Sequence, residues 1–258
     1  MLRPRLIPSL LIHEKGLVKT IQFDISKYIG DPINAVKIFN EKEVDELAIF
    51  DIDASVTKSE PDYVLISKLA SQSRMPLLYC GGVKTVDQAQ KIFALGVEKI
   101  GLSSSAIDNP DLITEISKRV GAQSVVIVLD VKKRKLGGYR IFTHNGKKKT
   151  GICPVKFAAL AQDMGAGEIV INSIDRDGTM NGYDMQLINE MRASVTLPMT
   201  VLGGAGSLKH LKEVVMSHGI IGVAAGSLFV FTGKYKAVLI NYPTPDEKEL
   251  ICKTETIE

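Results

Sequence analysis

Short apolar runs alternate with longer amphipathic stretches along almost the whole of this 258-residue chain. The short runs are rich in Val, Ile and Leu and are bounded by turn-forming residues, a pattern typical of buried strands. We predict strands at Leu6–Ile12, Glu46–Asp51, Pro76–Cys80, Lys99–Leu102, Ser124–Asp130, Glu168–Asn172, Met199–Leu202 and Gly222–Ala225.

The stretches between these runs carry apolar residues at helical spacing. We predict helices at Pro32–Lys42, Asp62–Ser73, Val86–Leu95, Asp111–Val120, Val155–Met164, Gln186–Ser194 and Leu208–Ser217. Start signals precede several of them: Asp31-Pro32, Thr85, Asn109-Pro110 and Ser207.

The near-continuous apolar character of the strands predicts burial on both faces, hence a parallel sheet covered by helices. Eight strands in a chain of this length favour an α/β fold of the (β/α)8 barrel type, with an open doubly wound sheet as the alternative. "DELAIFDIDAS" (45–55) resembles "GEIVINSIDRDG" (167–178), and "PLLYCGGV" (76–83) resembles "PMTVLGGAG" (198–206). We therefore expect one domain over 1–258, built from half-barrels at about 1–120 and 121–240, with a polar tail at 241–258 outside the barrel.

Composition narrows the class of protein. Hydrophobic residues make up 45% and charged residues 24% of the chain, and the net charge of +3 is too small to indicate nucleic-acid binding. The basic runs at 132–135 and 147–149 are either a solvated loop or a local anion-attracting patch. Three cysteines without metal spacing, no signal-peptide pattern and no apolar run long enough to span a membrane favour a reduced, cytoplasmic protein.

The carboxyl ends of the strands are the expected place for an active site in such a barrel. Glycine pairs there let backbone N–H groups approach an anion, and a following helix N-terminus adds positive potential. Gly81-Gly82 with Ser103-Ser104 forms one such place, and Gly203-Gly204 with Gly226-Ser227 the other. Although each Gly-Gly taken alone is equally a tight turn, the duplication predicts two phosphate sites on opposite sides of the barrel mouth.

Asp130 is the candidate general acid or base, because desolvation beside apolar strand ends raises a carboxyl pKa toward the working range. The alternative is a structural aspartate that caps a loop. Asp51, Asp177 and Gly178 also follow strands, and Lys19 could return over the mouth to meet an anion. The four histidines show no metal-binding spacing, so neither a metal nor a cofactor is assigned.

The first strand ends differently, in Leu10, Leu11 and Ile12, none of which can donate or accept a proton. From these residues alone it is either a plain core strand or a catalytic strand that has lost its ionisable group.

Five segments carry a family resemblance: "GDP" (30–32), "VDEL..FDI.AS" (44–55), "NP.LI" (109–113), "SIDRDGT..GYD" (173–184) and "GGAG" (203–206). Together they resemble the cyclase subunit of imidazole glycerol phosphate synthase, and the match runs from Met1 to about Phe231. The resemblance implies a (β/α)8 barrel that partners a class I glutaminase as a heterodimer at the N-terminal face of the barrel. Ammonia from the glutaminase crosses the barrel to a substrate with two phosphates, which is cleaved and cyclised.

The resemblance also implies roles for individual residues. The ammonia gate of the family is a ring of four charged residues, matched here by Arg5, Glu46, Lys99 and Glu168. Ion pairs that simply plug the barrel bottom are the structural alternative. The phosphate glycines, Ser227, Lys19, Asp51, Asp177 and the second catalytic aspartate, Asp130, match as well.

The departures lie at the opposite end, where Leu11 stands in the place of the first catalytic aspartate of the family. Ser9 replaces a cysteine, Leu202 a serine and Ser103 an asparagine. Loss of one acid/base group costs about 10²–10⁴-fold in rate, so the cyclase reaction itself is in question.

Three functions follow from these observations. The chain could be a working cyclase subunit that makes imidazole glycerol phosphate. A divergent branch associated with acetamidino-sugar formation for surface polysaccharides shares "RPRLIP.LL" (3–11) and "GDPINAVKIFNEKEVDEL" (30–47), and loss of the first aspartate favours this second function. The third is a non-enzymatic scaffold that activates a glutaminase.

Overall fold

A computed structural model describes residues 3–24 and 26–253. Eight parallel strands close into a barrel, because β10 pairs with β11 on one side and with β7 on the other. The barrel strands are β1 (Arg5–His13), β4 (Leu47–Asp51), β5 (Leu77–Cys80), β6 (Lys99–Leu102), β7 (Val125–Lys133), β10 (Glu168–Ser173), β11 (Met199–Leu202) and β12 (Gly222–Ala225). The predicted (β/α)8 barrel is thereby confirmed, and the open sheet is excluded.

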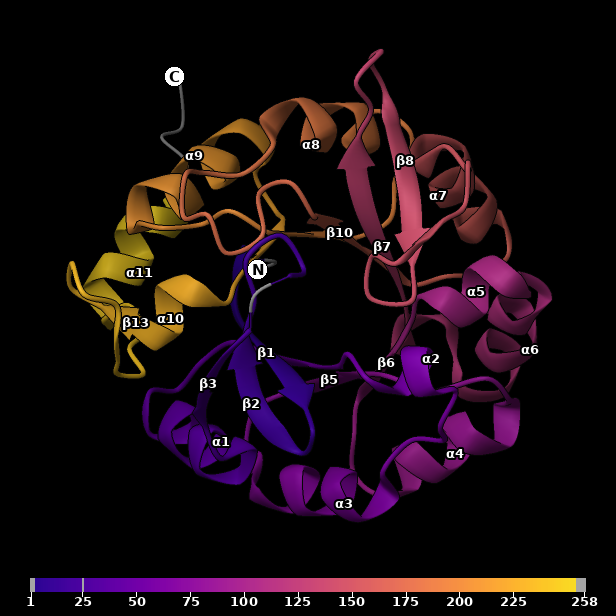
Figure 1. The fold of residues 1–258 in the computed structure, drawn as a ribbon, viewed down its shortest axis with the longest axis horizontal. Coiled ribbons are helices and arrows are strands. Elements are labelled where there is room, and N and C mark those ends of the chain that lie inside the picture. Colours follow the sequence, from indigo (N-terminus) through magenta and orange to yellow (C-terminus); the bar gives the residue numbers. More distant parts are fainter. Residues whose placement is uncertain (1–2, 25, 254–258) are drawn as a thin grey trace.

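A ring of helices surrounds the strands (Figure 1). Its main members are α1 (Pro32–Glu41), α3 (Tyr63–Gln72), α4 (Val86–Ala94), α6 (Asp111–Val120), α7 (Pro154–Asp163), α8 (Met185–Arg192), α9 (Leu208–His218) and α11 (Pro245–Cys252). The Asp31 side chain accepts a hydrogen bond from Asn34 N and that of Thr85 from Gln88 N, so these two residues cap α1 and α4 as predicted. Within the described part of the chain, no helix is long and apolar enough to cross a membrane.

The prediction that the tail from residue 241 lies outside the barrel is wrong for residues 241–253. Helix α11 packs beside α9 and is the eighth helix of the ring, and its Ile251 is buried. Tyr242 Oη donates to Leu6 O over 2.8 Å. Two widely spaced apolar anchors in a polar segment produce no helical periodicity, which explains the error; residues 254–258 lie outside the described part.

Shorter helices and strands lie around the mouth of the barrel, and the sequence did not predict them. Strands β2 (Gly16–Lys19) and β3 (Lys27–Gly30) continue β1 as an antiparallel extension. Strand β7 runs past Asp130 and pairs with β8 (Tyr139–Thr143), which pairs with β9 (Lys148–Lys149), so both basic runs lie on this antiparallel ribbon. The remaining short elements are α2 (Ala54–Thr57), α5 (Ser104–Asp108), a 3-10 turn at Ala122–Ser124, α10 (Ser227–Val230), β13 (Phe231–Thr232) and β14 (Ala237–Val238).

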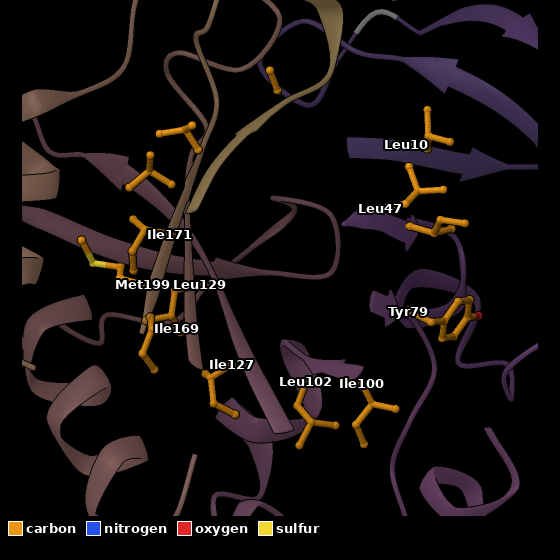
Figure 2. Close-up of a cluster of buried hydrophobic side chains, with 14 of the residues drawn as sticks. Leu10, Leu47, Tyr79, Ile100, Leu102, Ile127, Leu129, Ile169, Ile171 and Met199 are labelled. Atoms are coloured by element: carbon orange, nitrogen blue, oxygen red, sulfur yellow. The ribbon is translucent and has the colours of Figure 1, made fainter. Parts of the chain in front are cut away.

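The side chains of each barrel strand alternate between two cores. Leu10, Leu47 and Ile127 belong to the outer core between strands and helices, part of which Figure 2 shows. A smaller inner core, which includes Ile7, fills the barrel itself, and Leu11 packs against this core. Because side chains alternate along a strand, Arg5, Ile7, Ser9 and Leu11 of β1 all face the barrel interior.

Candidate functional site

The barrel bottom is closed by a ring of ion pairs. Arg5 pairs with Glu46 and, through Nη2, with Glu168 Oε1 over 2.6 Å. Lys99 Nζ lies 2.9 Å from Glu46 Oε2 and 2.9 Å from Glu168 Oε2. The four residues expected at the gate are therefore brought together, with each carboxylate paired to both cations.

Thr200 is a further member of this ring that the sequence did not single out. Its hydroxyl donates to Glu168 Oε1 over 2.6 Å. A Cβ at position 222 on the neighbouring strand would collide with the Thr200 side chain, so Gly222 makes room for it. The only signal in the sequence was a threonine inside an otherwise apolar strand.

The ring strongly stabilises its charges. Burial alone would raise the pKa of Glu168, but Arg5, Lys99 and the Thr200 hydroxyl outweigh it and lower the pKa to about 2. The two carboxylates in turn raise the pKa of Arg5, against the effect of its own burial. Glu168 and Arg5 are thus charged over the physiological range.

The opposite end of the barrel holds a cavity of about 350 Å³. Every residue predicted to bind substrate or phosphate lines it, together with Asp130: Lys19, Asp51, Gly81, Gly82, Ser103, Ser104, Asp177, Gly178, Gly203, Gly204, Gly226 and Ser227. The sequence did not predict Phe23, Lys58, His144 or Asn172 in this lining. Phe23, Lys58 and His144 lie on loops, whose conformation the hydrophobic pattern of the sequence does not predict.

The two glycine pairs lie on opposite sides of the mouth, after β5 and after β11. Gly82, Gly203 and Gly204 have φ angles of +73°, +93° and +111°, which side chains with a Cβ rarely adopt. A Cβ on Gly204 would also strike the carbonyl of Gly182. Glycine is therefore required here by the turns themselves, and it leaves the backbone open to the cavity.

Asp130 lies on β7 and lines the cavity. Its Oδ1 accepts a hydrogen bond from Asn172 Nδ2 over 2.9 Å. Enclosure by the barrel wall raises the Asp130 pKa to about 7, although the Asn172 hydrogen bond acts in the opposite direction. A carboxyl with such a pKa exchanges protons readily near neutral pH.

Lys19 and Asp177 line the cavity near Gly226. Lys19 is buried, donates to Ser9 O and lies against Gly226. Burial lowers its pKa to about 8, only partly offset by Asp177. Asp177 Oδ2 in turn accepts from the Thr20 hydroxyl over 2.7 Å.

Asp51 forms hydrogen bonds with the loop that follows it, which the sequence did not predict. Its Oδ1 accepts from the backbone N–H groups of Asp53 (3.0 Å) and Ala54 (3.1 Å) at the start of α2. It lines the cavity while fixing this loop.

Leu11 occupies the cavity wall on β1, where it packs against the inner core and lines the cavity. Ser9, on the same strand face, also lines the cavity. On this strand the cavity lining contains no ionisable side chain. No group of three or more potential metal-ligating side chains occurs within residues 3–24 and 26–253.

These features define a (β/α)8 barrel with a closed charged ring at one end and an acid-bearing, glycine-lined cavity at the other. The family model described as "Histidine biosynthesis protein" matches residues 5–236, and the chain belongs to that family. Within it, the chain is of the HisF-like type, the cyclase-subunit type of imidazole glycerol phosphate synthase.

Several relatives support this assignment. A Vibrio vulnificus (strain YJ016) protein, provisionally named imidazole glycerol phosphate synthase subunit hisF3, is 56% identical over 96% of each chain. A Leptospira interrogans protein with the provisional name of subunit HisF is 55% identical over 97% of this chain and 99% of its own length. The Streptomyces avermitilis imidazole glycerol phosphate synthase subunit HisF is 39% identical over 88% of this chain and 90% of its own.

Proposed function

We propose that this chain is the ammonia-consuming synthase subunit of a glutamine amidotransferase complex of the imidazole glycerol phosphate synthase type. The observation that carries the proposal is the polarity of one barrel: a ring of four paired charges at the bottom, and Asp130 with two glycine-lined sites at the mouth.

The ring of Arg5, Glu46, Lys99 and Glu168 is the entrance for ammonia in this proposal. Taking charges out of water is costly, and apolar residues would close a barrel bottom at least as well. A charged ring is better explained by a polar passage, and a class I glutaminase docked on this N-terminal face would supply the ammonia.

The mouth binds a phosphorylated acceptor in this proposal. The two glycine pairs face each other across the cavity, and Lys19 provides a cation beside Gly226. Two anion sites on opposite sides match a ligand with a phosphate at each end. Asp130, which lines the cavity between the two anion sites, then transfers protons to and from the substrate.

The first candidate reaction is the addition of ammonia to the histidine-pathway bisphosphate, which yields imidazole glycerol phosphate and an aminoimidazole carboxamide ribotide. The names of the relatives, including that of the Streptomyces avermitilis protein, favour it. The raised pKa of Asp130 suits its general acid/base role.

A second candidate reaction is favoured by Leu11, which lines the cavity where the family resemblance places an aspartate. In that reaction, ammonia converts an activated acetamido group of a sugar into an acetamidino group. The activating group would come from a further enzyme.

Ammonium chloride and the histidine-pathway bisphosphate, given to the isolated chain, separate the two reactions. Turnover that falls at least about 10²-fold in Asp130→Asn supports the cyclase reaction. Turnover that appears only in Leu11→Asp supports a changed acceptor. Ammonia-independent consumption of the bisphosphate would contradict the proposed function itself, and Leu11→Asn serves as the control for polarity without acid/base chemistry.

A further inference from the structure

A histidine and an aspartate form a close pair at the mouth, outside the residues used so far. His13 Nδ1 lies 2.6 Å from Asp53 Oδ1. The other carboxylate oxygen, Asp53 Oδ2, accepts the backbone N–H of Glu14 over 2.7 Å. His13 ends β1, and Asp53 precedes α2 on the neighbouring β4 side.

His13 lies two residues beyond Leu11 on β1. Residues two apart on a strand share a face and are separated by about 6.6 Å, so His13 follows Leu11 toward the mouth on the interior-facing side of β1. Ile52, which precedes Asp53, and Ser55, two residues after it, line the cavity together with Leu11. His13 and Asp53 are not themselves part of the cavity lining; they lie next to residues that are, and 39% of the His13 side chain is exposed.

The hydrogen bond fixes the imidazole's chemical form. An ionised carboxylate only accepts hydrogen bonds, so the proton on the neutral ring is on Nδ1, and Nε2 carries the lone pair. Among the hydrogen bonds of the described residues, none involves His13 Nε2. A carboxylate-oriented imidazole with a free second nitrogen is the arrangement of a general base.

We propose that His13 is a catalytic acid/base oriented by Asp53, serving the first-strand side of the mouth where Leu11 provides no proton-transfer group. This inference rests on the proposed function, because it takes the substrate to be a carbonyl acceptor for ammonia.

The proton balance is simple. When the ammonia nitrogen bonds to the carbonyl carbon, the nitrogen must lose a proton, and His13 Nε2 accepts it. The resulting imidazolium is stabilised by Asp53. Nε2–H then protonates the alkoxide oxygen, which gives the neutral carbinolamine. A second proton passes in the same way from the nitrogen through Nε2 to the hydroxyl, which leaves as water while the C=N bond forms, and the ring returns to its neutral form. Asp130 on the other wall remains available for later proton transfers.

The charges around His13 are consistent with this role. Asp53 raises the His13 pKa through the hydrogen bond, burial opposes it, Glu14 adds a smaller increase, and Lys147 of the β8–β9 turn lowers it. These groups come from the β4–α2 loop, from the β1–β2 turn and from the ribbon over the mouth.

The first test needs no substrate. Long-range ¹⁵N–¹H spectra of the full chain should show neutral His13 as the Nδ1–H tautomer, with a pKa above the ordinary 6.5 that falls in Asp53→Asn. His218→Gln identifies an unrelated histidine signal. An Nε2–H tautomer for His13 would overturn the proposal whatever the substrate is.

The second test uses turnover with ammonium chloride, on the histidine-pathway bisphosphate or on an activated acetamido sugar. Asp53→Asn keeps an oxygen for Glu14 N–H and so preserves a purely structural clamp. The proposal expects it and His13→Gln each to lower kcat by at least about 10²-fold, with KM changed only a few-fold and the limb of the pH profile that depends on His13 lost. Leu11→Asp in the His13→Gln background should restore part of the rate.

Two further results separate the dyad from the proposed function. Normal kcat in both variants, like that expected for the exposed Glu213→Gln control on α9, would overturn the dyad while leaving the ammonia-dependent synthase intact. No ammonia-dependent turnover of either acceptor by the unaltered chain would overturn the proposed function, and with it the catalytic role of His13.

Discussion

Glu168 and Asp130 are two carboxyls that point into the same barrel, yet their acidities move in opposite directions. At the bottom, two cations and a hydroxyl lower the pKa of Glu168 to about 2. At the mouth, Asp130 has one amide hydrogen bond, and enclosure raises its pKa to about 7. The number of compensating partners, rather than depth in the barrel, decides the outcome.

The difference distinguishes the ring at the bottom, whose charges are paired within the protein, from the mouth, where a ligand would supply the missing partners. The ring satisfies all of its own charges, whereas the mouth leaves Asp130 and Lys19 with shifted pKa values and few partners. Shifted acidities without internal compensation are typical of functional sites.

Removing Glu168 should produce the largest change in stability. Glu168→Ala leaves Arg5 and Lys99 with Glu46 alone, and breaking such a buried pair costs about 3 to 5 kcal/mol in the free energy of unfolding. The folded-state pKa of about 2 lies below the ordinary 4.5, so this stabilisation is complete above about pH 5 and lost as pH falls through 2.

Urea unfolding at a series of pH values measures this effect, with the exposed Glu213→Ala on α9 as the control. The curves of the Glu168→Ala variant and the unaltered chain should converge in acid. A difference that stays constant from pH 7 to pH 3 would contradict the ion-pair explanation.

Asp130→Asn should raise the free energy of unfolding, whereas Glu168→Ala lowers it. The folded pKa of about 7 lies above the ordinary 3.8, so the ionised group reduces stability as pH rises from 4 to 7. An asparagine still accepts the Asn172 hydrogen bond without this penalty and should raise the free energy of unfolding at pH 8 by about 2 kcal/mol. The gain should vanish at pH 4; a variant less stable at pH 8 would show that Asp130 is already compensated.

Lys19 offers a smaller test at the mouth, in ligand affinity. With a pKa of about 8, Lys19 loses its charge between pH 7 and pH 9, so affinity for a phosphate ester should fall about 10-fold over that range. Calorimetric titration with glycerol 3-phosphate measures it, and Lys19→Met should bind weakly at both pH values. The exposed Lys212→Met should keep the full pH dependence; a flat profile for the unaltered chain would place the phosphate elsewhere.

The sequence predicted the barrel because its signals are local and repeated: each strand is a short apolar run followed by a helix with its own start. It also placed the cavity lining, since the carboxyl ends of the strands share one edge, whereas the ring was expected from the family resemblance. What it missed depends on contacts between distant segments. His13 and Asp53 are forty residues apart and meet only because β1 and β4 are neighbours, and Thr200 joins Glu168 across another strand pair.

Helix α11 was missed because its segment is polar and lacks helical periodicity, although it has a local start signal, and it leads to the smallest expected effect. Thr244 and Glu247 form a capping box at its start, and Lys248 pairs with Asp45, whose Oδ2 accepts the Leu6 N–H at the bottom of β1 over 2.9 Å. Thr244→Ala should therefore lower the free energy of unfolding by about 1 kcal/mol, as measured by urea denaturation.

Ser207 provides a matched control, because it precedes α9 at the N-cap but its side chain makes no capping hydrogen bond. Ser207→Ala should leave stability almost unchanged. Since α11 is tied to the bottom of the first strand and not to the cavity, Thr244→Ala should also leave the affinity for glycerol 3-phosphate unchanged. Loss of that affinity would mean that the bottom and the mouth are mechanically coupled through β1, and that the two ends of the barrel are less independent than their electrostatics indicate.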